Sequence, residues 1–275
     1  MKCGVLGDPI AHSLSPVLHR AGYVACGLDW EYDAHRVPAG GLAAFVDGLD
    51  ASWRGLSVTA PLKREAADRA DSVTATVALA GVANTLVRED GGWQADNTDV
   101  PGAVRAVREQ WDGPVTAATV LGGGATAAST GLALAELGAR VVRLLVRDPE
   151  RAQDAAAAIA RHPSGPLVEV EPLHESGVIG EIVVSTIPAA AQTADVVERC
   201  ADVPVVFEVV YHPWPTPLAA SVLRPLLTPG TSGDGRVLVT GLDLLVHQAA
   251  LQLARFTGHP ADAALLSAMR AALPA

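Results

Sequence analysis

The feature that most limits the fold is a strand–glycine–helix–strand unit in the middle of the chain. In "TVLGGGATAAS", residues 119–129, an apolar strand runs into Gly122, Gly124 and Ala127 and then into an alanine-rich helix. A second apolar strand, "RVVRLLV", follows at 140–146. This order is typical of a parallel sheet whose glycine turn lets backbone N–H groups approach a pyrophosphate at a helix N-terminus. A close strand–helix crossing without a ligand is the alternative, but the order of elements favours dinucleotide binding.

The residues after the second strand bear on the choice of nicotinamide cofactor. An NAD site usually has an acid at this strand end, where it binds the ribose hydroxyls. Here Val146 is followed by Arg147, with Arg151 one helical turn beyond. Two guanidinium groups suit a 2′-phosphate, unless they simply lie on a solvated loop. Asp148 between them either repels that phosphate or caps the following helix. The pattern favours NADP.

Short strand-like and helix-like segments alternate along the whole chain. In the first hundred residues we predict strands at 2–7, 30–37 and 54–60, helices at 15–27, 41–49 and 61–70, and a hairpin at 81–98 with its turn at 90–92. A second series covers 117–152, 181–188, 203–211, 215–227 and 235–258, with a helix-rich region at 160–175 around a loop at 162–166. The alternation predicts an α/β protein with mainly parallel, covered sheets in two units that meet near residue 100. The C-terminal helices fit either unit.

Composition excludes several classes of function. With 275 residues, 49% of them hydrophobic, the chain can bury a substantial core. Its net charge of -10 argues against nucleic acid and anionic membranes as partners. A small anionic substrate stays open, because a few local cations outweigh a diffuse negative field at short range.

Cysteine and histidine placement argues against disulfides and metals. Cys3, Cys26 and Cys200 are odd in number and far apart, as expected in a reducing compartment. The 8 histidines are scattered, with neither an i, i+4 pair nor an H-E-x-x-H pattern. The first residues have too short an apolar run for a signal peptide. We therefore expect a cytoplasmic protein without a metal; both a monomer and a homodimer remain open.

Lys63 and Asp99 are polar residues in unusual places. Lys63, in "GLSVTAPLKREA", falls in the first turn of a helix predicted to begin at Pro61, where positive charge is disfavoured. Asp99 ends the polar cluster "ADNTD", which is by itself typical of a turn or helix cap. A lysine at a helix start needs a carboxylate nearby, and a Lys–Asp pair in a cleft can exchange a proton with a substrate oxygen. We predict that the two side chains form such a pair.

Ser13 and Ser15 lie beside another predicted helix start. Ser15, which precedes Pro16, is predicted to be the N-cap, and this leaves Ser13 without a structural role. Two hydroxyls at a helix N-terminus also make a cradle for a carboxylate. The neighbouring His12 is interpreted as a structural loop histidine.

Seven motifs, in order, resemble those of the shikimate dehydrogenase family over essentially the whole chain: "GDPIAHSLSPVLH", "SVTAPLK", "GVANTLV", "ADNTD", the glycine turn, "YHPWPTPL" and "GLDLLVHQA". The resemblance implies NADPH-dependent reduction of 3-dehydroshikimate to shikimate, in chorismate and aromatic amino-acid biosynthesis. It also implies a substrate domain of residues 1–100 plus 241–275 and a Rossmann-like NADP-binding domain of residues 101–240. The C-terminal helices are then expected to return to the first domain, and the crevice between the domains to hold the reacting groups.

The resemblance also assigns roles to individual residues. Lys63 and Asp99 match the catalytic pair. The expected substrate-binding residues are Ser13, Ser15, Thr59, Asn84, Tyr211 and Gln248. The expected cofactor-binding residues are Gly122, Gly123, Gly124, Ala125, Thr126, Arg147, Arg151, Thr186 and Gly241.

The chain also departs from the family's pattern. Ser57 stands where asparagine is frequent, and Val100 where glycine is frequent. The turn "GGGATA" lacks a common fourth-position glycine, and "VRD" replaces Asn-Arg-Thr after the second cofactor strand. Two alternatives therefore stay open: an NAD-preferring quinate/shikimate dehydrogenase, and a sensor of the same fold that binds ligand without catalysis.

Overall fold

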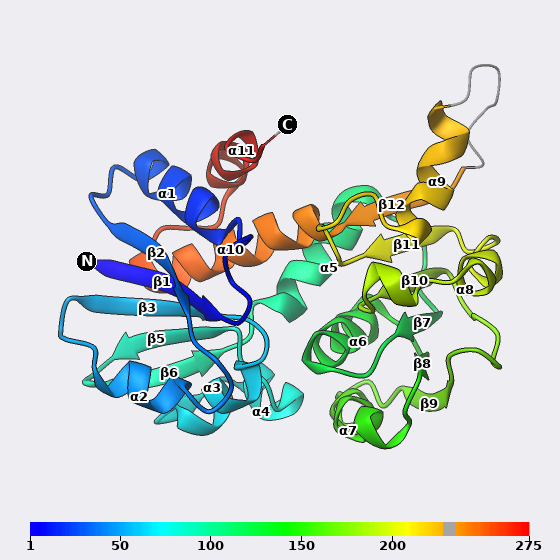
Figure 1. Cartoon of the computed structure of the whole chain (residues 1–275), viewed down its shortest axis with the longest axis horizontal. Helices are drawn as coiled ribbons and strands as arrows, with labels where there is room; N and C mark the ends of the chain where they lie inside the picture. The colour runs from blue at the N-terminus through cyan, green and yellow to red at the C-terminus, as the bar shows by residue number, and fades with distance from the viewer. Residues whose placement is uncertain (228–234, 275) are drawn as a thin grey trace. The chain divides into compact units, whose positions relative to one another are not determined.

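In this computed structural model, the strands among the described residues, 1–227 and 235–274, form two six-stranded sheets, and each sheet organises one unit of the chain (Figure 1). The first unit comprises Met1–Gly102 and Leu245–Ala275, and the second Ala103–Leu244. Two helices contain a boundary between the units: α5 (Asp99–Gln110) and α10 (Gly241–Thr257).

The first unit alternates strands and helices before it ends in a hairpin. Its further elements are β1 (Lys2–Gly7), α1 (Ser15–Ala25), β2 (Glu31–Arg36), α2 (Leu42–Asp47), β3 (Trp53–Val58), α3 (Lys63–Arg69), β4 (Ser72–Val73), α4 (Ala75–Ala80), β5 (Thr85–Glu89), β6 (Gly92–Asp96) and α11 (Ala263–Ala271). The strand order is β2-β1-β3-β5-β6-β4. Strand β1 pairs in parallel with β2 and β3, and β4 in parallel with β6, whereas β5 runs antiparallel to both neighbours.

The hairpin turn follows from its two central residues. Asp90 has φ 46° and Gly91 φ 84°, and two consecutive positive φ values are what a two-residue turn between twisted strands requires. This turn returns the chain along β6, so that the start of β5 and the end of β6 lie together: Thr85 is paired with Asp96.

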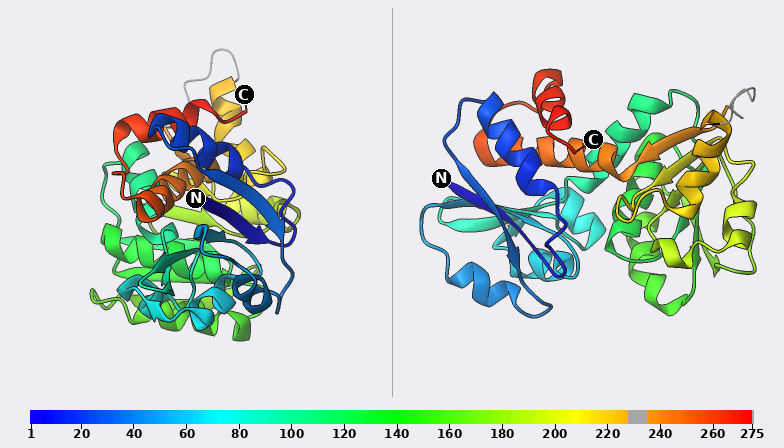
Figure 2. Two further views of the ribbon diagram at one scale, coloured as in Figure 1. Left: turned by 90° about the vertical axis from the view of Figure 1, so that its left-hand side faces the viewer. Right: turned by 45° about the horizontal axis from the view of Figure 1, so that its top comes forward.

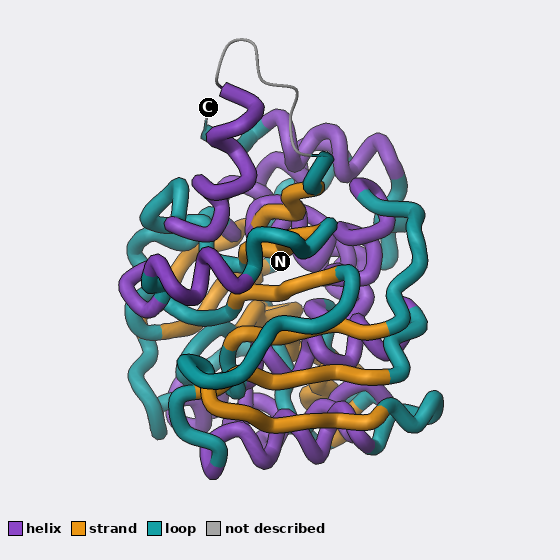
Figure 3. Tube along the Cα trace, turned by 90° about the vertical axis from the view of Figure 1, so that its right-hand side faces the viewer, coloured by secondary structure: helices purple, strands orange, loops and turns teal. Residues whose placement is uncertain are grey.

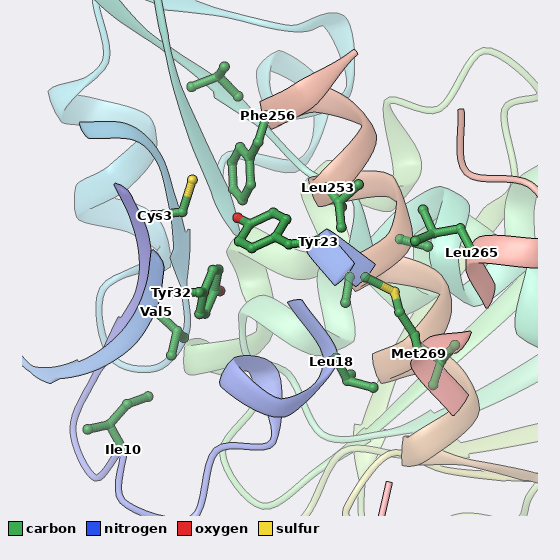
Figure 4. Packing of buried hydrophobic residues seen from close by; sticks show 14 residues of the cluster. Cys3, Val5, Ile10, Leu18, Tyr23, Tyr32, Leu253, Phe256, Leu265 and Met269 are labelled. Carbon is green, nitrogen blue, oxygen red and sulfur yellow. The ribbon is translucent and has the colours of Figure 1, made fainter. Parts of the chain in front are cut away.

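Apolar side chains cover both faces of this sheet. Helices α1, α10 and α11 lie over one face (Figure 2), where Tyr23, Tyr32 and Phe256 are each at most 1% exposed (Figure 4). Helices α2, α3 and α4 pack on the other face, around Leu42, Ala66 and neighbouring strand residues. Burying this surface on both faces drives the three-layer arrangement.

The second unit is a parallel sheet. Its elements are β7 (Ala117–Leu121), α6 (Ala125–Leu137), β8 (Val141–Val146), η1 (Glu150–Ala152), α7 (Gln153–Ala160), β9 (Leu167–Pro172), β10 (Ile182–Ser185), η2 (Ala189–Ala191), α8 (Ala194–Arg199), β11 (Val205–Glu208), α9 (Pro217–Leu227) and β12 (Val237–Thr240). The strands lie side by side among the helices (Figure 3), in the order β12-β11-β10-β7-β8-β9. The chain thus starts in the middle, builds outward to one edge and then to the other, which is the order of a doubly wound dinucleotide-binding sheet. The predicted α/β class is confirmed.

Two local predictions were wrong. Pro61 is not the first helical residue, because the Leu62 N–H donates to the Thr59 carbonyl at 2.9 Å and this turn delays the helix until Lys63. Residues 167–172 form the edge strand β9 rather than helix. Their alternation of Val168, Glu169, Val170 and Glu171 has the two-residue period of a strand.

Candidate active site

Strand directions bring most of the predicted substrate-binding positions to one edge of the first sheet. The parallel strands β1 and β3 both end at this edge, and they are followed by the segments that carry Ser13 and Thr59. Because β5 is antiparallel to β3, its beginning lies at the same edge, next to Asn84. Strand β6 ends there too, just before Asp99. Positions far apart in the sequence therefore meet at one edge of one sheet.

Lys63 and Asp99 form an ion pair at this edge. Nζ of Lys63 donates to Oδ2 of Asp99 at 2.5 Å, and the two side chains are only 11% and 8% exposed. Each is the first residue of a helix, α3 and α5. A helix start favours the carboxylate and disfavours the ammonium, so the aspartate offsets the unfavourable position of the lysine. The predicted pair is present in the structure.

Asn84 connects this pair to neighbouring polar groups. Its Nδ2 donates to Oδ1 of Asp99 at 2.8 Å and lies 3.3 Å from Oε1 of Gln248. Its Oδ1 accepts the backbone N–H of Thr98 at 2.9 Å. The structure thus brings Lys63, Asp99, Asn84 and Gln248 together. Thr98, which lies inside the quoted "ADNTD" motif, is a partner that the sequence analysis did not single out.

The helix start beside Ser13 and Ser15 differs from the prediction. Leu14, not Ser15, is the N-cap of α1, and no side chain caps that position. The hydroxyl of Ser13 instead accepts the Ser15 N–H at 3.3 Å, so Ser13 has the structural contact and Ser15 is the first helical residue. Thr59 lies directly beyond β3, with its backbone N–H bonded to the Leu6 carbonyl at 2.9 Å. All three residues stay candidates for substrate binding.

The predicted cofactor-binding residues lie at the carboxyl edge of the second sheet. The glycine turn follows β7, Arg147 follows β8, Thr186 follows β10 and Gly241 follows β12. Strand order reverses between β7 and β10, and ligands of open parallel sheets bind outside the strand ends at such a reversal.

Close backbone approach explains two of the three glycines of the turn. Gly122 has φ 118°, and a Cβ there would lie 2.2 Å from Oγ1 of Thr186. A Cβ on Gly123 would lie 2.6 Å from the Cβ of Ala152. Around Gly124, by contrast, a Cβ would meet no atom of the described chain within 4 Å. The turn is thus packed against the protein at two glycines and open at the third.

The start of α6 completes an anion-binding arrangement. Gly124 is its N-cap and no side chain caps it, so no capping side chain occupies the N–H groups of the first turn, which begins with Ala125 and Thr126. Uncapped N–H donors and open space beside them are what a pyrophosphate requires. The residues present therefore fit a dinucleotide.

Charged residues follow β8, among them Arg147, Asp148 and Arg151. Oδ1 of Asp148 accepts the backbone N–H of Glu150 at 3.2 Å, at the start of η1. Pro149, not Asp148, is the N-cap of η1, so Asp148 contacts the start of this turn without being its cap residue. Arg147 and Arg151 are both exposed and accessible to a phosphate.

Tyr211 belongs to the second unit, and burial raises the pKa of its phenol.

Three residues before Tyr211, Glu208 is fully buried at the end of β11. Its Oε1 accepts the Val210 N–H at 3.0 Å, and its Oε2 accepts from Gln192 and Thr216 at 2.7 and 2.8 Å. Burial raises the pKa of this carboxyl. Glu208 was missed by the sequence analysis, although an acid inside the apolar run "VVFEVV" is a recognisable signal.

Within residues 1–227 and 235–274, no group of three or more His, Cys, Asp or Glu side chains gathers in a way that could hold a metal ion. None of the helices in that part of the chain has the length and apolar character needed to cross a membrane.

Two family models match the chain. Residues 5–86 match the shikimate dehydrogenase substrate binding domain. Residues 241–273 match the shikimate 5'-dehydrogenase C-terminal domain.

Known proteins resemble the chain over nearly its whole length. A shikimate dehydrogenase (NADP(+)) of Moorella thermoacetica is 32% identical, covering 95% of this chain and 90% of that protein. The crystal structure of Mycobacterium tuberculosis shikimate dehydrogenase is 40% identical with a TM-score of 0.86, covering 99% of each chain. The shikimate 5-dehydrogenase of Thermus thermophilus, solved in complex with NADP(H) and shikimate, is 26% identical with a TM-score of 0.80, covering 99% of this chain and 100% of that one.

Proposed function

This chain belongs to the shikimate dehydrogenase family, and we propose that it catalyses the reversible NADPH-dependent reduction of 3-dehydroshikimate to shikimate. The observation that carries the proposal is the buried pair of Lys63 and Asp99, 2.5 Å apart at a sheet edge that also presents Asn84 and Gln248. Reduction of a ring ketone needs a proton donor beside the carbonyl oxygen and several polar groups to orient the ring hydroxyls. The pair and its neighbours supply both.

Lys63 acts on the reacting oxygen. In the reductive direction negative charge grows on the C3 carbonyl oxygen, where the ammonium stabilises it and donates the proton from Nζ. In the oxidative direction the neutral amine accepts the proton of the C3 hydroxyl. Asp99 holds Nζ in position through Oδ2, and it hydrogen-bonds a neighbouring ring hydroxyl.

The remaining polar residues fix the ring. Asn84, Gln248 and Thr59 orient its hydroxyl substituents. Ser13 and Ser15 hold the substrate carboxylate, with Tyr211 as a further contact. A ring held on several sides loses its orientational freedom on binding rather than in the transition state, which lowers the barrier.

NADP(H), when bound, supplies or accepts the hydride. The N–H groups of the turn from Gly123 to Thr126 bind its pyrophosphate, and Thr186 and Gly241 line the same sheet edge. The Gly122 N–H donates to the Leu145 carbonyl at 2.9 Å, so Gly122 shapes the turn rather than donating to the phosphate. Arg147 and Arg151 bind the 2′-phosphate through charge-assisted hydrogen bonds. Asp148 lies between the two arginines, and its Oδ1 accepts the Glu150 N–H while the carboxylate keeps its charge.

Absorbance at 340 nm tests the proposal with purified protein and four pairs of substrates: shikimate or quinate, each with NADP⁺ or NAD⁺. We expect shikimate with NADP⁺ to give the highest kcat/KM. A preference for NAD⁺ with quinate would instead support a quinate/shikimate dehydrogenase. Protein that binds shikimate and NADP⁺ in a calorimeter but forms no NADPH would be a sensor, and the proposal would be wrong.

We propose the cytoplasm as the site of the reaction, with shikimate and NADP(H) as small-molecule partners of a monomer or homodimer. The three cysteines are free thiols, two of them buried, which is typical of a reducing compartment.

A further inference from the structure

We propose that Gln252 and Thr85 are positioning residues for the reaction, because a directed series of buried hydrogen bonds connects them to the Asn84 amide that holds Asp99. The inference rests on the proposed function. Neither residue belongs to the expected set of substrate-binding side chains, and both are buried, at 1% and 0% exposure. They act through other residues and do not touch the substrate.

Gln252 lies in α10 and uses the whole hydrogen-bonding capacity of its amide. Nε2 donates to the Asn84 carbonyl at 2.9 Å and to Oγ1 of Thr85 at 3.0 Å. Oε1 lies 2.7 Å from Oγ of Ser57 and 3.3 Å from Nε2 of His19. Two donors and two acceptor sites are thus all satisfied, so the amide is fixed inside the core.

The partners determine which way this amide points. A backbone carbonyl can only accept a hydrogen bond, so the atom facing the Asn84 carbonyl is the NH₂ group. Oε1 therefore faces Ser57 and His19, and both of these donate to it. Tyr32 in turn donates to Oγ of Ser57 at 2.6 Å. The chemistry of the partners thus sets the direction of each bond.

Thr85 connects the Gln252 amide to the Asn84 side chain through two hydrogen bonds of its hydroxyl group. Its Oγ1 accepts from Gln252, so its own hydrogen is available for Oδ1 of Asn84, which lies 2.7 Å away. The N–H of Thr98 also donates to that oxygen, at 2.9 Å. With Oδ1 held by two donors, Nδ2 of Asn84 must face Oδ1 of Asp99, at 2.8 Å.

As a consequence, the two carboxylate oxygens of Asp99 have different partners. Oδ1 is held by Asn84, and Oδ2 is thereby directed to Nζ of Lys63. Without the Thr85 hydroxyl, Oδ1 of Asn84 loses one donor and keeps the Thr98 N–H. Without Gln252, the Asn84 carbonyl and the Thr85 hydroxyl lose the amide that positions them. In both cases the Asn84 side chain is held less firmly against Asp99. A displacement of that carboxylate misplaces the ammonium that transfers the proton, and small misplacements slow catalysis strongly.

Five variants, compared with wild type, test the inference in the shikimate oxidation assay. Gln252→Leu removes the amide, Thr85→Val removes the hydroxyl at constant shape, and the double variant removes both. Thr85→Ser restores the hydroxyl. Thr119→Val is the matched control, because Thr119 is also fully buried and its hydroxyl makes two hydrogen bonds with the backbone of Ile179, but in the second unit. All are assayed well below their own unfolding temperatures, so that only folded protein is compared.

We expect kcat to fall by about ten-fold in Gln252→Leu and in Thr85→Val, the size typical of losing a residue that orients a catalytic group. The double variant should be little worse than either single variant, because the two changes interrupt one series of bonds. KM for NADP⁺ should stay unchanged, and Thr85→Ser should keep kcat within about two-fold of wild type. Should Gln252→Leu not fold, Thr85→Val and Thr85→Ser still decide the question.

The outcomes separate the inference from the proposed function. An active wild type whose kcat is unchanged in Thr85→Val, or falls equally in Thr119→Val, overturns the positioning role and leaves the proposed function in place. A wild type that does not oxidise shikimate overturns both.

Discussion

His19 is predicted to make the stability of the protein depend on pH between 7 and 5. Its imidazole is completely buried and stacks on Tyr32 with ring centroids 4.1 Å apart and planes 8° from parallel. Nε2 donates to Gln252, while Nδ1 has no hydrogen-bond partner in the described part of the chain. Burial lowers the pKa of this histidine from 6.5 to about 3, because a charged imidazolium would have no water around it.

The sign of the effect follows from this lowered pKa. Below pH 6.5 the unfolded chain binds a proton at His19 that the folded protein does not bind until about pH 3. Acid therefore favours the unfolded state. Between pH 7 and pH 5 the residue should lower the free energy of unfolding by about 2 kcal/mol, since each pH unit below the unfolded pKa adds about 1.4 kcal/mol. The surrounding Tyr23 and Tyr32 do not titrate in this range, because burial raises their pKa values.

Urea unfolding at pH 7 and pH 5, followed by tryptophan fluorescence, measures this contribution. His19→Gln keeps an N–H donor near the position of Nε2 but cannot be protonated, so it should lose about 2 kcal/mol less than wild type between the two pH values. His174→Gln, which replaces an exposed histidine, is the matched control and should behave as wild type does. Equal pH dependence in wild type and His19→Gln would refute the reasoning.

Three further predictions concern the glycine turn, the phosphate site and a helix cap. Gly122→Ala should destabilise the protein by about 1–3 kcal/mol in urea unfolding and weaken NADPH binding in a fluorescence titration, because the position has a positive φ and its Cβ would overlap Thr186. Arg147→Ala should raise the Kd for NADP⁺ by about ten-fold while leaving that for NAD⁺ unchanged, since only the former carries a 2′-phosphate; equal losses for both would exclude the phosphate contact. Asp262→Ala should lower the free energy of unfolding by about 1 kcal/mol, because this carboxylate caps the first turn of α11, and an unchanged urea midpoint would show that the cap contributes nothing.

The sequence allowed the two sheets to be predicted because both depend on local patterns. Apolar runs of strand length, a glycine turn after β7 and the pair Asp90–Gly91 each constrain a few neighbouring residues, and together they define the strand directions. Helix starts were less predictable. At Ser15 and Pro61 the residue types favour a helix start, but local hydrogen bonds of the preceding segment moved the first helical residue by one or two positions.

The site could be predicted only in part, and for a physical reason. Lys63 and Asp99 are conspicuous because a helix start with a lysine needs a carboxylate, and motif resemblance pointed to Asn84 and Gln248. Gln252 carries no such signal, since a second glutamine one turn beyond Gln248 resembles a tolerated polar residue of the same helix. Its role depends on meeting Asn84, 168 residues away in the chain, and that encounter is set by the packing of α10 on the sheet.

The central claim, that the Lys63 ammonium transfers the proton, is tested most directly by kcat for shikimate oxidation in Lys63→Ala. The chain has only two lysines, so Lys2→Ala, at the start of β1, is the natural control. Loss of general acid–base assistance should reduce kcat by about 10²–10⁴-fold while KM for shikimate changes little, and Lys2→Ala should retain wild-type kcat. A Lys63→Ala enzyme that turns over at the wild-type rate would contradict the account.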